Sequence, residues 1–283
     1  MRNLSIYRAS AAFLLLCGLF LGLPALAAGP NTFSYVYAPV LGTGAYKAGD
    51  ETILVIKMPF SIALDDEDDP GIKRKILLTT TAGISNFDFK SVAEDPTDRL
   101  KSPRDDVKTI SFLPGMKWTI PLEGDAHVSP FAQIGRARDA GRDIDATLGI
   151  AGVKHVRTWP INRRWLTLGN SVIFAGQRLD SSGEKQGFLL FENGLDYEWP
   201  TGWRAMGTQL TMSSYVLWRH FGNQLDMVGV QGEKVKIKDL FSLGVTFGFH
   251  EAVDWSIPIQ RVGVSLTRGD DLKAITFNLG FPF

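Results

Sequence analysis

The strongest constraint on the fold is a strict alternation of residue types near the end of the chain. From Phe241 to Phe249 every odd-numbered residue is large and apolar, and every even-numbered one is Ser, Gly or Thr. The segments 262–267 and 275–283 repeat the pattern. Because successive side chains of a strand point to opposite faces, each segment predicts a strand with one apolar face and one small or polar face.

Two details of this alternation favour a transmembrane barrel over a soluble sandwich, whose strands also alternate. The apolar face is rich in Phe and Leu, and the opposite face is small, as in barrels with lipid outside and a polar lumen inside. After residue 27 no apolar run reaches the ~20 residues of a spanning helix, so a membrane would be crossed by strands. We therefore predict an all-β fold, a transmembrane antiparallel up-and-down β-barrel.

Weaker alternation along the rest of the chain predicts about 12 strands, and 10 to 14 are compatible with the pattern. Many segments are close to the ~9–11 residues that a tilted strand needs to cross a bilayer. An even number puts both termini on the periplasmic side, and the two longest connections, 88–106 and 219–235, then both face outside. The predicted strands are residues 31–40, 51–62, 74–87, 107–120, 126–135, 145–156, 165–176, 186–197, 203–217, 236–249, 257–267 and 272–283.

The first residues have the pattern of a secretory signal peptide. Arg2 and Arg8 precede the apolar run from Ala11 to Leu23, and small residues at Ala25 and Ala27 suit a cleavage site. The run is too short for a spanning helix. We expect residues 1–27 to be the signal and 28–283 to form the barrel domain.

Cysteine content and charge exclude several classes of function. Cys17 is the only cysteine and lies inside the expected signal, so the mature chain has no thiol for disulfides, metal ligation or catalysis. Without Arg2 and Arg8, 28 of the 30 basic residues remain against 30 acidic ones, a net charge of −2. This balance gives no support for nucleic-acid binding, which requires a basic patch.

We expect no cofactor and no metal, because no metal-ligand spacing occurs. The acidic run Asp65–Asp69 lacks the ligand spacing of a calcium loop and is interpreted as a solvated turn.

Tryptophan and proline gather at the connections that would face the periplasm. Trp prefers the lipid–water boundary because its ring is amphipathic, which gives membrane barrels an aromatic girdle. Proline suits these turns because it lacks the N–H that a central strand must donate. Six of the seven tryptophans flank these turns and are the predicted girdle: Trp118, Trp159, Trp165, Trp199, Trp203 and Trp255.

The C-terminal strand resembles the last strand of bacterial outer-membrane proteins. Ile275, Phe277, Leu279, Phe281 and the final Phe283 alternate as in that class, where the barrel-assembly machinery reads the terminal aromatic pattern as an insertion signal. Pro282 departs from the pattern. The length and the Trp/Pro turns make the chain similar, more narrowly, to the twelve-stranded translocator barrel of autotransporters without a passenger. The resemblance implies an outer-membrane location, with membrane lipids and the assembly machinery as partners.

Catalysis is a weaker hypothesis, and it rests on one pair of residues. His127 and Ser129 are two positions apart on a predicted strand, so both side chains share one face. The pair superficially resembles the His-x-Ser of outer-membrane lipid A deacylases, but Pro130 and Phe131 follow here in place of Asn and Ala. Asp145 and Asp196 lie in predicted strands and are interpreted as ordinary polar residues facing the lumen.

Two functions follow from these patterns. The first is a structural barrel or a narrow pore for small solutes, without a catalytic site. The alternative is a lipid-modifying hydrolase that uses His127 and Ser129. The small inner-face residues Gly244, Gly248, Gly263 and Ser265 leave open whether the lumen is empty or filled by an inward-folded segment.

Overall fold

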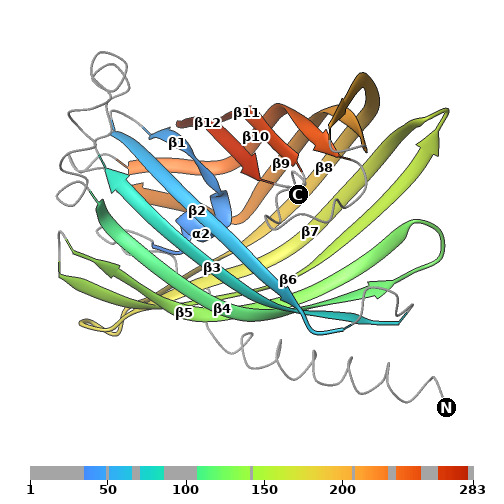
Figure 1. Ribbon diagram of the computed structural model, residues 1–283. Coiled ribbons are helices and arrows are strands. Elements are labelled where there is room, and N and C mark those ends of the chain that lie inside the picture. Colours follow the sequence, from blue (N-terminus) through green and yellow to red (C-terminus); the bar gives the residue numbers. More distant parts are fainter. Residues whose placement is uncertain are drawn as a thin grey trace.

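Twelve antiparallel strands form one closed barrel in the computed structural model of the protein (Figure 1). The structure describes residues 35–48, 51–65, 71–85, 107–140, 143–205, 208–228, 234–249 and 261–279. No helix among them has the length and apolar character needed to cross a membrane. The predicted all-β, up-and-down barrel is therefore confirmed, with the expected number of strands.

Each strand pairs with its neighbours in sequence, and β1 pairs with β12 to close the ring. The elements are a short helix α2 (Tyr37–Leu41) and strands β1 (Thr43–Ala48), β2 (Glu51–Ala63), β3 (Lys73–Ser85), β4 (Val107–Pro121), β5 (Ala126–Asp139), β6 (Ile144–Ile161), β7 (Arg164–Leu179), β8 (Lys185–Ala205), β9 (Thr208–Val228), β10 (Lys234–Phe249), β11 (Arg261–Gly269) and β12 (Leu272–Leu279).

The two rims of the barrel differ in their connections. At the turn end lie the connections β2–β3, β4–β5, β6–β7, β8–β9 and β10–β11. The loop end carries the other connections, including the stretch of 21 residues between β3 and β4. The turn end corresponds to the rim that the sequence predicted to face the periplasm.

Two sequence predictions about the strands were wrong. The first strand was expected at 31–40, but the described part of that range is a turn followed by α2, and the first strand is β1. Residues 219–235 were expected to form a long loop, yet β9 continues to Val228. In the first case an apolar segment packs inside the lumen as a plug, and in the second the strand extends beyond the clear alternation.

The barrel wall alternates as the sequence predicted. Outward side chains on β2, β10, β11 and β12 are large, apolar and exposed, among them Phe60, Phe241, Leu243, Leu266 and Phe277. On the inner face, hydroxyl groups of neighbouring strands pair with each other. Ser242 meets Thr267 at 2.7 Å and Ser213 meets Thr246 at 2.8 Å. These pairs satisfy polar groups that would otherwise be buried without partners.

A segment from Tyr35 to Leu41, here called the plug, fills the lumen in the half nearer the loop end (Figure 1). The Tyr35 and Val36 amides donate to Gln177 Oε1 at 2.6 and 3.3 Å, and the Tyr35 hydroxyl contacts Asp139. The Tyr37 ring packs 5.0 Å from the ring of Phe188. The lumen is therefore filled at the loop end, which settles the alternative that the sequence left open.

Candidate functional site: a charged cavity in the lumen

Below the plug the lumen holds a cavity of about 360 Å³. Pro39, Val40 and Leu41 of the plug form its roof, and strands from across the barrel form its walls. Its volume falls in the range of about 300–1,000 Å³ that small-ligand sites occupy. The cavity is thus a candidate binding site between the plug and the turn end.

Three lysines from three different strands project toward this cavity. Lys57 lies on β2, Lys117 on β4 and Lys154 on β6, each in line with buried residues of the inner face. Within the described ranges, no hydrogen bond or ion pair joins any of the three ammonium groups to another residue. Unpaired cations in a recess attract anions, because low-dielectric walls focus their field.

One carboxylate faces these lysines and is itself held by other groups. Glu192 on β8 is only 6 % exposed. Arg219 Nε donates to Glu192 Oε1 at 2.8 Å, and the Ser171 hydroxyl donates to Oε2 at 2.7 Å. A buried carboxylate is tolerated when a cation and further donors satisfy it. Because Arg219 neutralises Glu192, the three lysines leave the cavity with an excess of positive charge.

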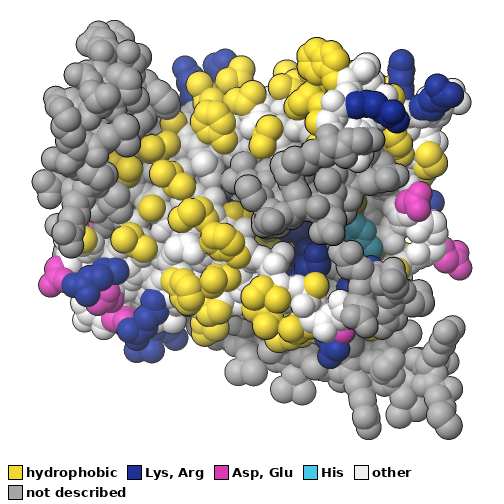
Figure 2. Space-filling model, in the orientation of Figure 1, with side chains coloured by type: hydrophobic (Ala, Val, Ile, Leu, Met, Phe, Trp, Pro, Cys, Tyr) yellow, Lys and Arg dark blue, Asp and Glu magenta, His cyan; other side chains and the backbone are white. Residues whose placement is uncertain are grey.

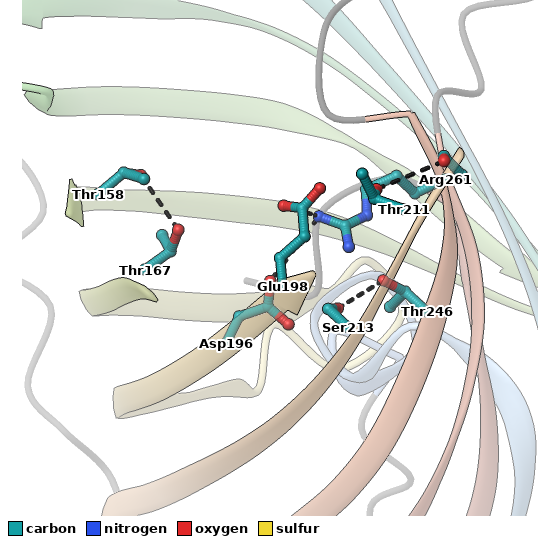
Figure 3. Close-up of polar contacts among 9 residues, drawn as sticks. Thr158, Thr167, Asp196, Glu198, Thr211, Ser213, Thr246 and Arg261 are labelled. Carbon is teal, nitrogen blue, oxygen red and sulfur yellow. Dashed lines mark hydrogen bonds and ion pairs between the residues drawn. The ribbon is translucent and has the colours of Figure 1, made fainter. Parts of the chain in front are cut away.

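A second cluster lies nearer the turn end, where Asp196, Glu198 and Arg261 converge (Figure 3). Arg261 Nη1 is 2.9 Å from Glu198 Oε2 and 3.7 Å from Asp196 Oδ2. All three side chains are buried, and Asp196 is 0 % exposed. Two carboxylates therefore flank a single guanidinium in a part of the lumen that is buried from solvent.

Hydroxyl side chains frame this second cluster. Figure 3 shows Ser213 and Thr246 paired beside Asp196, and Thr158 and Thr167 paired further along the wall, 3.1 Å apart. The hydroxyls come from adjacent strands, as elsewhere on the inner face. These paired hydroxyls give the cluster a polar surrounding without adding charge.

The two clusters give the lumen an uneven charge distribution. The acidic groups Glu192, Asp196 and Glu198 all lie on β8, where each alternate residue faces inward. The lysines lie on β2, β4 and β6. Since Arg219 and Arg261 pair with the acidic row, the unpaired charge of the cavity lies on the lysine wall. The arrangement can hold an anion.

His127 and Ser129 both lie on β5 with their side chains on the inner face. Ser129 is buried, and its hydroxyl lies 3.2 Å from the hydroxyl of Thr119. No hydrogen bond joins His127 to Ser129 in the described structure. An activated serine needs a base within hydrogen-bond reach, and the described structure shows no such bond between these two residues.

The tryptophans of the predicted girdle that the structure describes all lie toward the turn end. Trp118, Trp159 and Trp199 alternate with inward residues and so point outward, whereas Trp165 shares its face of β7 with the buried Thr167. Trp203 is exposed near the end of β8. Trp255, Phe281 and Phe283 lie outside the described residues. Phe277 points outward from β12, and Leu279 ends that strand.

Sequence reasoning found one acidic residue of the site and missed its basic residues. Asp196 faces the lumen as expected, but Asp145 points outward opposite Arg138. The inward lysines were missed because each is a single charge in an otherwise ordinary strand. A signal was present in the sequence: each lysine is an even number of residues away from the buried residues of its strand, so it lies on the same inward face. No group of three His, Cys, Asp or Glu side chains in the described part of the chain could hold a metal.

Comparison with known proteins gives a fold likeness only. No family model matches the chain, and no curated protein matches it. Among solved structures, the β-domain of the Bordetella autotransporter BrkA is similar at a TM-score of 0.51 and 12 % identity, covering 84 % of this chain and 96 % of that one. The translocator domain of the autotransporter NalP from Neisseria meningitidis gives a TM-score of 0.50 and 10 % identity, covering 83 % and 82 %. The resemblance to a translocator-type barrel is thus confirmed at the level of the fold.

Proposed function

We propose that this chain is an outer-membrane barrel that takes small anions into its lumen, as a narrow anion-selective pore whose passage the plug restricts. The observation that carries the proposal is the convergence of Lys57, Lys117 and Lys154 on one cavity, where the lining carboxylate Glu192 is already paired with Arg219. Cations left unpaired in a recess raise the local concentration of anions. The outward apolar side chains and the fold likeness support the membrane location, with lipids outside and the barrel-assembly machinery as the route of insertion.

The membrane location has a direct test in gel mobility. A closed barrel has every strand paired around the ring, so we expect the membrane-extracted protein to migrate differently before and after boiling. Recovery in the soluble periplasmic fraction without such a shift would contradict the membrane location. The same assay reports correct folding for every variant below.

The anion preference is tested in planar bilayers under a salt gradient. We expect a reversal potential on the anion-selective side, and we expect the triple substitution Lys57→Gln, Lys117→Gln, Lys154→Gln to move it toward the cation side because three inward charges are lost. The matched control replaces three exposed lysines near the loop end: Lys47, Lys238 and Lys273. A barrel without conductance, or with equal shifts in both triple variants, contradicts the proposal.

A further inference from the structure

Among the described residues, the pairing between β1 and β2 stops well before the end of β2. The register between β1 and β2 ends at Val55, whereas β2 itself continues to Ala63. On β1 the last residue paired with β12 is Thr43, opposite Phe277. Among the described residues, no strand therefore lies beside β2 from Ile56 to Ala63 on that edge.

The edge of β2 is closed by a side chain and then by a proline. The Thr43 hydroxyl donates to the Lys57 carbonyl at 3.0 Å and accepts from the Lys57 amide at 2.9 Å, which ends the pairing. The next backbone donor on this edge would belong to residue 59, because backbone groups alternate sides along a strand. That residue is Pro59, which has no N–H to offer. The edge is thus built to stop pairing below Thr43.

The cavity of the lumen reaches this opening. Its walls include Pro59 of β2 together with Phe277 and Asn278 of β12. Phe277 is 52 % exposed on the outward face with Ile275 and also lines the cavity, so the cavity extends to the edge of β12 that faces β2. Met58 and Phe60 are exposed on the outward face of β2. Figure 2 shows basic side chains set back near the centre of this face, with hydrophobic side chains to the left of them and below them.

The described residues at the opening therefore give it an apolar outer side and a basic interior. Outside lie Met58, Phe60 and Phe277, and inside lie the three lysines. The three apolar side chains lie on the outward face of the wall. In the membrane-spanning barrel proposed above, they face the lipid. Such a passage fits a molecule with an anionic head and an aliphatic chain, because each part meets matching surface.

We propose that the passage between β2 and β12, here called the lateral portal, binds a single-chain acidic amphiphile from the membrane. The head group contacts Lys57 and Lys117 in the cavity, and the chain leaves the barrel between Pro59 and Phe277. The inference rests on the proposed function for the anion-binding lumen, and it adds the class of ligand and the route of entry. Small soluble anions would enter from the turn end instead.

Native mass spectrometry of the purified full-length chain tests the portal with three probes. We expect dodecanoate to saturate at one molecule per barrel. Dodecanol keeps the chain but has no charge, and butanoate keeps the charge but has no long chain. Each should therefore bind at least about tenfold more weakly than dodecanoate. Dodecanol that binds as tightly as dodecanoate would overturn the proposal, because the head group would then be irrelevant.

Variants separate the head-group site from the portal. Lys57→Gln should weaken dodecanoate binding about tenfold, the loss expected for one charge-assisted contact, whereas Lys47→Gln should not. Pro59→Trp should fill the portal and weaken dodecanoate binding by a similar factor of about ten. If that variant fails to shift on boiling, Phe277→Ser replaces it, with an expected weakening of about threefold from lost apolar contact. Portal variants that leave dodecanoate binding unchanged contradict the lateral route.

The outcomes distinguish the two proposals. A barrel without anion preference in bilayers removes the proposed function. A barrel with anion preference that binds dodecanoate no more tightly than butanoate keeps the proposed function and removes only the lateral portal.

Discussion

The two halves of the lumen have walls of the same alternating strands, but one half is packed with apolar side chains and the other carries charged ones. In the half near the loop end, the plug packs against apolar side chains such as Leu148, Leu190 and Phe221, all buried. In the half near the turn end, inward positions carry lysines, carboxylates and arginines around a cavity. The wall supplies alternation in both halves, so the difference comes from which residues occupy the inward positions. One half holds the plug in place and the other can hold a charged ligand.

The largest expected effect concerns the buried charges of the turn-end half. Arg261→Met leaves Asp196 and Glu198 without their cation, and removing one partner of a buried ion pair costs about 3–5 kcal/mol. We expect a lower urea midpoint for the folded gel band, with partial recovery at acidic pH because protonation removes the uncompensated negative charge.

Matched variants sharpen this result. Adding Asp196→Asn and Glu198→Gln to Arg261→Met should restore most of the stability, since no unpaired charge then remains buried. Arg138, exposed on the outward face of β5, supplies the control as Arg138→Met. Equal losses for Arg261→Met and Arg138→Met would remove the distinction between a buried charge cluster and the surface.

A smaller effect is expected in the loop-end half. Gln177→Leu removes the acceptor for the amides of Tyr35 and Val36, and a buried donor left without a partner costs about 1–3 kcal/mol. The lost hydrogen bonds destabilise the docking of the plug and not the barrel wall. We therefore expect a higher conductance, with an unchanged gel-mobility shift on boiling. Gln209→Leu, at an exposed site near the turn end, is the control. Unchanged conductance in Gln177→Leu would show that these two bonds do not hold the plug.

The smallest effect should be the same in both halves. Ser242→Ala and Ser213→Ala each remove one hydroxyl pair of the inner wall, one in each half. A single neutral hydrogen bond contributes about 0.5–1.5 kcal/mol net. Urea titration of the folded band should give similar losses for both variants. A large loss confined to Ser213→Ala would instead tie that hydroxyl to the neighbouring charge cluster.

Alternation along the chain was enough to predict the barrel, the number of strands and most of their positions. It works because the period of two is a local property of a strand, and because the outer and inner surfaces of a barrel demand different side chains. The long alternating run from Phe241 to Phe249 illustrates this, since β10 contains all of it. The same rule failed at residues 31–40, where an apolar segment became a plug and not a strand.

The sequence by itself determined which face most strand residues occupy, although it assigned Asp145 to the wrong one. Only the tertiary structure decided which inward residues meet, because contacts across a lumen depend on the stagger of every strand around the ring. Lys57, Lys117 and Lys154 lie far apart in sequence and carry no shared motif, yet closure of the barrel brings them to one cavity. The end of the β1 pairing near Thr43 likewise became visible only in the register of β1 with β2 and β12. Local alternation builds the wall, and long-range closure places the charges and the portal.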